Sequence, residues 1–68
     1  MLIRYIGEYC RHFKKKNQYK LVDIFRSTNP DCKNGYLFLI FGDYGLVEME
    51  YEDLDEFNKN WEYVYDNM

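Results

Sequence analysis

Residues 35–51 have the sequence GYLFLIFGDYGLVEMEY, and the rest of the chain is interpreted around them. The apolar run Tyr36–Phe41 is followed by the turn-forming run Gly42–Gly45 and by the alternating run Leu46–Tyr51. Apolar and alternating runs on either side of a glycine-containing turn are typical of a β-hairpin. The first strand has no polar face, so we expect it to be covered on both sides. The second strand is predicted to place Val47, Met49 and Tyr51 on one face and Leu46, Glu48 and Glu50 on the other.

The chain has 68 residues, 47% of them hydrophobic and 21% aromatic, with a formal net charge of −3. This length predicts a single domain spanning residues 1–68. Chains this short bury only about 60% of their unfolded surface, so large aromatic rings must supply much of the core. The rings exceed what a small core absorbs. We therefore expect some at the surface, where tyrosine and tryptophan favour protein interfaces.

The segment before residue 17 shows a helical pattern. Apolar residues recur there at spacings of three and four, which predicts an amphipathic helix over residues 2–16 with an apolar stripe of Leu2, Ile6, Tyr9 and Phe13. Gly7 would cost this helix about 1 kcal/mol relative to alanine. A strand is the competing interpretation. It would place Leu2, Arg4 and Ile6 on one face and Ile3, Tyr5 and Gly7 on the other.

Two further elements flank the hairpin. Tyr19–Ser27 is rich in β-branched and aromatic residues and is predicted to be a strand, followed by an exposed loop to Gly35 that contains Pro30. After the hairpin, Asp53 and Glu56 form a capping-box pattern that predicts the start of a second helix. The apolar stripe of that helix would comprise Leu54, Phe57, Trp61 and Val64, with Tyr65 and Met68 beside it.

These elements predict an α+β fold, a small α-β-β-β-α domain with a three-stranded antiparallel sheet and two helices on one face. If the first segment is a strand, the alternative is a four-stranded sheet with a C-terminal helix. Either arrangement leaves one face of the sheet bare. The candidates to cover it are a second copy, a partner or the loop Thr28–Asn34. A bare face carrying Leu37, Leu39 and Phe41, or Tyr36, Phe38 and Ile40, would be a recognition surface.

Charge is unevenly distributed along the chain. Acidic residues dominate from Asp43 onward, and six of them lie within the nine residues from Glu48 to Glu56. Helix capping and the solubility of an edge strand can explain these acids. They can also form a patch that substitutes for nucleic-acid phosphates and attracts a basic groove on another protein. The predicted partner-binding residues are Tyr44, Glu48, Glu50, Tyr51, Glu52, Asp55 and Glu56.

Basic residues concentrate in the first third of the chain. A solvated helix end can explain them, and so can contacts to phosphates with an aromatic ring nearby. This alternative function is nucleic-acid binding through segment 11–20, with a homodimer through the open sheet face. A subunit with a purely structural role is a third interpretation. The residues of the nucleic-acid alternative are Arg11, Lys14, Lys15, Lys16 and Lys20.

Two resemblances bear on these interpretations. The predicted element order and the length are similar to the double-stranded-RNA-binding domain, but that family begins its second helix with lysines where this chain has Glu52-Asp53-Leu54-Asp55-Glu56. No RNA-contacting residue is transferred from it. In size, acidity and aromatic content the chain resembles phage-encoded inhibitors of host nucleases, including anti-CRISPR and DNA-mimic proteins. This resemblance implies an inhibitor that occupies the nucleic-acid groove of a basic enzyme.

Signatures of catalysis are missing from the sequence, and we expect neither an enzyme nor a cofactor. Cys10 and His12 would point apart on a helix, and together with Cys32 they lack the paired spacing of a zinc site. Two cysteines are too few for a secreted disulfide scaffold. Arg4 interrupts the apolar start where a signal peptide would continue, and no run is long enough to span a membrane. We therefore expect a reduced, cytoplasmic protein.

Overall fold

The computed structural model describes residues 1–31 and 34–64. Within these residues the chain forms five strands and one short helix, and all neighbouring strands are antiparallel, in the order β4-β3-β2-β1-β5. The elements in chain order are β1 (Leu2–Tyr5), β2 (Gln18–Arg26), β3 (Tyr36–Gly42), β4 (Gly45–Tyr51), α1 (Leu54–Asn60) and β5 (Trp61–Tyr63).

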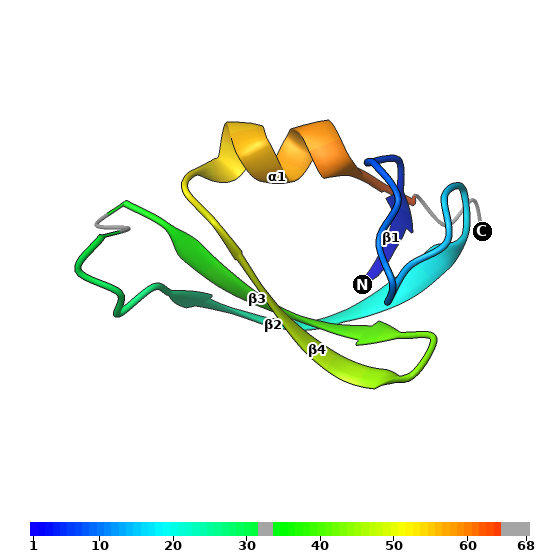
Figure 1. Ribbon diagram of the computed structural model, residues 1–68, viewed down its shortest axis with the longest axis horizontal. Helices are drawn as coiled ribbons and strands as arrows, with labels where there is room; N and C mark the ends of the chain where they lie inside the picture. The colour runs from blue at the N-terminus through cyan, green and yellow to red at the C-terminus, as the bar shows by residue number, and fades with distance from the viewer. Residues whose placement is uncertain (32–33, 65–68) are drawn as a thin grey trace.

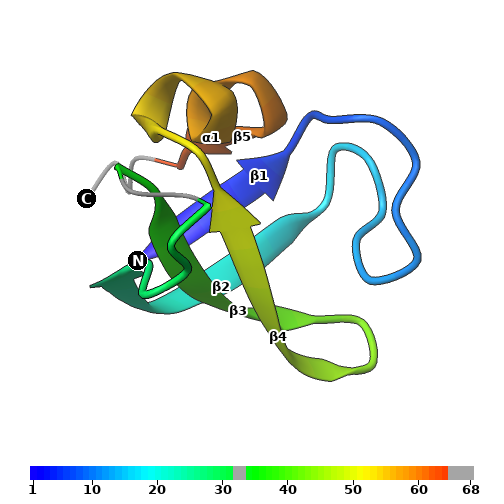
Figure 2. The same ribbon diagram turned by 60° about the vertical axis from the view of Figure 1, so that its left-hand side comes forward.

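The sheet is strongly curved, and α1 lies across its concave side (Figure 1). Strands β1 to β4 follow one another as a meander, and α1 then leads from the β4 edge to β5 at the other edge. Figure 2 shows residues 6–17 as a long loop that leaves the sheet at the same end as the tip of the β3–β4 hairpin. Helix and sheet therefore enclose the core between them, and the convex side of the sheet faces outward.

The predicted hairpin is confirmed. Gly42 pairs with Gly45 around the two-residue turn Asp43-Tyr44, and Gly45 has a φ of +122°, which favours glycine. Val47, Met49 and Tyr51 share one face of β4 as expected, and that face packs on the core. The expectation that β3 is covered on both sides is wrong. Phe38 and Ile40 are 0% exposed, whereas Phe41 is 50% exposed. The β-strand predicted over Tyr19–Ser27 is also confirmed, as β2.

The predicted helix over residues 2–16 is wrong, because β1 and an irregular loop occupy this segment. β1 pairs with β2 on one side and with β5 on the other, so its backbone groups are satisfied by two neighbours. Ile3 and Tyr5 are both buried, so they lie on one face, as in the competing strand interpretation. A Cβ at Gly7 would clash with the side-chain oxygen of Asn60, so the Asn60 side chain would have to move to admit one.

The second helix begins where the sequence predicts. Asp53 is its N-cap and accepts a hydrogen bond from the backbone N–H of Glu56 at 2.8 Å, while the Glu56 carboxylate accepts one from the backbone N–H of Glu52 at 2.9 Å. The helix ends at Asn60, because Trp61 is extended and starts β5. Both predicted folds are therefore wrong: the structure is mainly β, not a three-stranded sheet with two helices, and the four-stranded alternative lacks β5. Tyr65 and Met68 lie outside the described residues, as does Cys32.

The core consists mainly of aromatic rings. Phe57 of α1 stacks on Phe38 of β3, with centroids 4.1 Å apart and planes 2° from parallel. Trp61 is 1% exposed, makes an edge contact with Phe13 at 4.8 Å, and donates its Nε1–H to the Tyr51 hydroxyl at 2.9 Å. Such pairs add to the free energy of burial itself. The loop 6–17 therefore contributes Phe13 to the same core that holds the sheet and the helix together.

Candidate functional site

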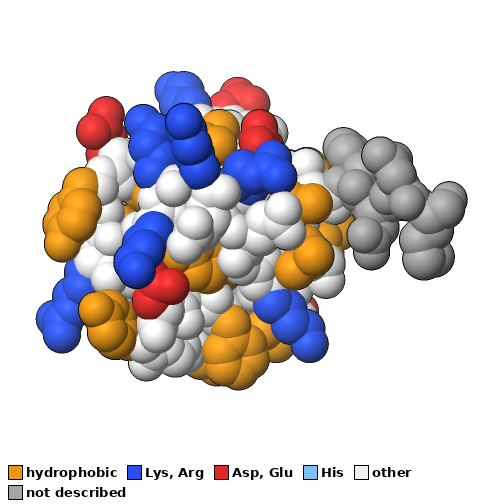
Figure 3. Space-filling model, turned by 90° about the vertical axis from the view of Figure 1, so that its right-hand side faces the viewer, with side chains coloured by type: hydrophobic (Ala, Val, Ile, Leu, Met, Phe, Trp, Pro, Cys, Tyr) orange, Lys and Arg blue, Asp and Glu red, His pale blue; other side chains and the backbone are white. Residues whose placement is uncertain are grey.

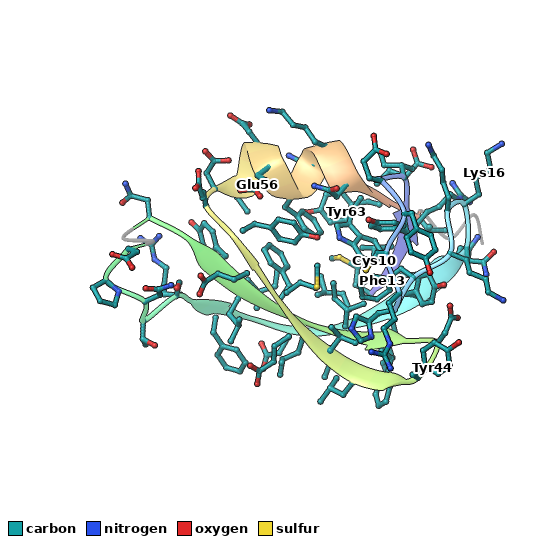
Figure 4. The ribbon with its side chains drawn as sticks, in the orientation of Figure 1. Cys10, Phe13, Lys16, Tyr44, Glu56 and Tyr63 are labelled. Atoms are coloured by element: carbon teal, nitrogen blue, oxygen red, sulfur yellow. The ribbon has the colours of Figure 1, made fainter. Side chains whose placement is uncertain are left out.

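The convex side of the sheet carries an exposed apolar surface. Leu37, Leu39 and Phe41 alternate with the buried residues of β3 and lie beside residues of β2 and β4 on the same side. Figure 4 shows side chains projecting from this side of the sheet, away from α1. Phe25, Phe41 and Leu46 are each 47–54% exposed. We call this surface the outer face; its apolar residues are Phe25, Leu37, Leu39, Phe41 and Leu46.

Carboxylates accompany the apolar residues of the outer face. Asp23 and Glu48 lie directly across the strands from Leu39, and Glu50 lies across from Leu37. Among the described residues of β2, β3 and β4 that pair on the outer face, the only basic one is Lys20, which lies opposite Phe41. Arg4 of β1 is paired with Glu62 at 2.7 Å. The outer face is therefore apolar at its centre and mainly acidic around it.

The seven predicted partner-binding residues do not share one surface. Glu48 and Glu50 lie on the outer face, Tyr44 is 80% exposed at the hairpin tip, and Tyr51 is 5% exposed in the core. Burial raises the pKa of the Tyr51 phenol to about 12. The remaining residues of the set, Glu52, Asp55 and Glu56, lie where β4 ends and α1 begins.

Some of these carboxylates also have roles within the protein. Glu50 accepts hydrogen bonds from Ser27 Oγ at 2.7 Å and from Asn29 Nδ2 at 3.2 Å, so it ties the loop after β2 to β4. Glu56 accepts the backbone N–H of Glu52, as described above. Glu48, Glu52 and Asp55 are exposed. They are the members of the predicted set best placed for a partner.

The basic segment forms a second surface, at the end of the molecule where loop 6–17 lies. Arg11, Lys14 and Lys15 line a hollow of about 390 Å³ between this loop and the hairpin tip. Figure 3 shows lysine and arginine side chains gathered over this end. Lys16 and Tyr44 both lie at this end, and Glu56 lies toward the other (Figure 4). Lys20 does not line the hollow, since it belongs to the outer face.

Hydrogen bonds hold the basic loop in place. The backbone N–H of Lys16 donates to the Tyr5 carbonyl at 2.7 Å, and the backbone N–H of Asp43 donates to the His12 carbonyl at 2.9 Å. The Tyr19 hydroxyl accepts the Lys14 N–H at 2.7 Å and donates to the Asp43 carboxylate. The hollow is therefore formed by a backbone that the sheet and the hairpin both restrain.

Sequence reasoning missed parts of both surfaces. Asp23 and Phe25 join the outer face because β2 has an irregularity between Leu21 and Asp23, which shifts the register against β3. No pattern in the sequence marks that shift. Tyr9 was assigned to the buried stripe of a helix, yet it is 96% exposed and lines the hollow. The signal in the sequence that could have indicated an exposed position for Tyr9 was the group of lysines that follows it, two of which, Lys14 and Lys15, line the same hollow.

Among residues 1–31 and 34–64, no group of three histidine, cysteine or acidic side chains is placed to hold a metal ion. No helix in the same part of the chain is long and apolar enough to cross a membrane. No protein-family model matches this chain, and the comparisons with curated proteins and with solved structures find no match.

Proposed function

We propose that this protein acts by binding another protein through the outer face. The observation that carries this proposal is the group of large apolar side chains left exposed on one side of the sheet, since such patches mark interaction sites in soluble proteins. Phe25, Phe41 and Leu46 are each about half exposed. Full burial of such a side chain contributes about 1.5–3 kcal/mol, so covering the exposed half of each would contribute about 1 kcal/mol.

The charges around this surface favour a basic partner. Asp23, Glu48 and Glu50 border the apolar centre, against the single base Lys20 in the same rows of the described sheet. Carboxylates at the margin of an interface steer a positively charged partner and disfavour an acidic one. The partner surface that fits is therefore apolar in part and carries lysine or arginine side chains.

The most concrete form of the proposal is an inhibitor of a nucleic-acid-handling enzyme, of the phage-encoded anti-CRISPR or DNA-mimic type, acting in the host cytoplasm. A groove that binds phosphates is basic, and the exposed carboxylates Asp23 and Glu48 of the outer face would occupy the places of phosphates in it. Such an inhibitor needs no catalytic group and no cofactor. Its affinity falls as salt is added, because charges at the margin of an interface are screened.

The test is a pull-down from a cell lysate with the tagged protein, followed by competition of the recovered complex with duplex DNA or RNA. Phe41→Ser with Leu46→Ser removes apolar contact, and Glu48→Lys reverses one charge of the outer face. The matched controls are Leu54→Ser, which is half exposed on α1, and Asp31→Lys, which is exposed in the loop after β2. All five positions are exposed in the structure, so each of the four variants should fold.

The proposal expects a basic nucleic-acid-binding protein that the wild type and both controls retain and both outer-face variants lose. Added duplex DNA or RNA should displace this inhibitor from the recovered protein. Retention by Phe41→Ser with Leu46→Ser would contradict the role of the outer face. Binding that nucleic acid does not displace would contradict the inhibitor form.

A second copy of the chain is the other occupant to be tested. Light scattering of the purified protein should show a monomer at micromolar concentration. A dimer that dissociates in Phe41→Ser with Leu46→Ser would show that the outer face is covered by another copy. That result would overturn the proposal of a basic partner.

A further inference from the structure

We infer that the hollow between loop 6–17 and the hairpin tip binds a single strand of nucleic acid, with its phosphates on the basic side chains and a base stacked on an exposed tyrosine. This site is separate from the outer face, because none of the outer-face residues lines the hollow. The inference therefore stands or falls independently of the proposed function.

The first support is the placement of positive charge. Arg11, Lys14 and Lys15 line one hollow although they are spread over five residues of chain. Lys16 follows in a tight turn at a φ of +75°, a backbone conformation uncommon for lysine, and is exposed beside them. Cations on a restrained loop can contact successive phosphates without having to order the backbone on binding.

The second support is the exposure of two tyrosines. Tyr9 is 96% exposed and Tyr44 is 80% exposed, and both line the same hollow. Neither ring contributes to the core, so neither is needed where it is for folding. Aromatic side chains beside a basic groove are the usual means by which proteins bind single strands, because every base has a face that can stack.

The third support is size. A hollow of about 390 Å³ is at the lower end of ligand sites in proteins. It accommodates one base and not a duplex. In a duplex the bases are stacked inside the helix, so Tyr9 and Tyr44 could reach only the backbone. A single strand can offer its phosphates to the basic side chains and an unstacked base to a tyrosine at the same time. We therefore assign the site to single strands.

Two acids also line the hollow. The Asp43 carboxylate accepts the Tyr19 hydroxyl at 3.1–3.2 Å, and so has a structural task, while Glu8 is exposed at the margin. They limit the number of phosphates that the site can hold. Contact with three phosphates, one for each basic side chain of the lining, gives a slope of about −2 for log K against log salt. The affinity should then fall about 20-fold between 50 and 200 mM salt.

The test is fluorescence anisotropy of labelled 12-residue oligo-dT and oligo-U, with a DNA hairpin duplex and inorganic polyphosphate as competitors. We expect both single strands to bind at 50 mM salt and to compete better than the duplex. Lys14→Ala with Lys15→Ala should weaken binding at least tenfold. Tyr9→Ala should weaken it about tenfold, and Tyr9→Phe should not.

The matched control removes two positive charges elsewhere. Lys20→Ala on the outer face combined with Lys59→Ala on α1 should leave the affinity within twofold of wild type. An equal loss in this control would overturn the site, since only total charge would then matter. Full affinity of Tyr9→Ala with Tyr44→Ala, or equal competition by polyphosphate, would show an anion site only. No binding at 100 µM protein in 50 mM salt would also overturn the inference.

Discussion

Replacement of Phe57 by alanine should remove most of the stability of this protein. Phe57 is the one buried residue of α1 and is 1% exposed. It stacks on Phe38 at 4.1 Å and makes an edge contact with Tyr51 at 5.7 Å. Phe→Ala changes in a core cost about 3–5 kcal/mol. A 68-residue domain has a total of about 3–10 kcal/mol at typical values per residue. At the middle of these ranges, about 4 of about 6–7 kcal/mol is lost, so Phe57→Ala should keep less than half of the free energy of unfolding at 25 °C.

Urea unfolding followed by fluorescence tests this, because Trp61 is the single tryptophan and is 1% exposed in the folded state. Two variants separate the causes. Phe57→Leu keeps most of the apolar contact but loses the stacked ring, and should cost about 1–2 kcal/mol. Leu54→Ala, on the exposed side of the same helix, should cost less than about 1 kcal/mol. A loss of less than about 1 kcal/mol in Phe57→Ala, or one equal to that of Leu54→Ala, would refute the packing of α1 described above.

Three further predictions concern single positions. Burial raises the pKa of Tyr51 from 10.0 to about 12, so the folded state keeps a proton that the unfolded chain loses. The free energy of unfolding should therefore fall as the pH rises from 10 to 12. Urea titrations at each pH should show less of this fall in Tyr51→Phe. Asp53→Ala removes the N-cap of α1 and should lower the free energy of unfolding by about 1 kcal/mol, with Asp53→Asn near wild type as its control. Gly42→Ala would bring a Cβ within 2.7 Å of the His12 carbonyl, so it should lower the melting temperature and speed amide exchange in loop 6–17; unchanged exchange there would contradict this contact.

Local patterns predicted the hairpin well. The apolar run, the glycines of the turn and the alternation to Tyr51 are properties of adjacent residues, and they determine the register of β3 and β4 without help from the rest of the chain. The cap of α1 was predictable for the same reason, since Asp53 and Glu56 are three residues apart. Both features depend on interactions that are local in sequence.

The first segment was not predictable in this way. Spacings of three and four between Leu2 and Phe13 favour a helix, but β1 has two strands to pair with, and both come from later in the chain. Trp61 was similarly ambiguous, because it is buried in the structure and would have been buried on a longer helix as well. Tertiary pairing decided between two local patterns of comparable strength.

The candidate sites depended on the same long-range information. The sequence showed that acids and bases lie in different parts of the chain, but the faces on which they lie follow from the register of β2 against β3 and from the course of loop 6–17. Lys20 was grouped with Lys14 to Lys16 by position, but it lies opposite Phe41 on the outer face and does not line the hollow. The bare face was predicted from the placement of the helices on one side of the sheet, whereas the composition of β3 alone predicted a strand covered on both sides.

The pairing of β1 with β5 also determines when this protein can fold. Ile3 lies opposite Tyr63, so this contact closes a loop of almost the whole chain, and such closures are slow relative to local ones. During synthesis, β1 has no β5 partner until residue 63 has left the ribosome, whereas the β3–β4 hairpin can form much earlier. The N-terminal strand must therefore wait with one edge unpaired, and its exposure to other chains lasts as long as translation of the remainder.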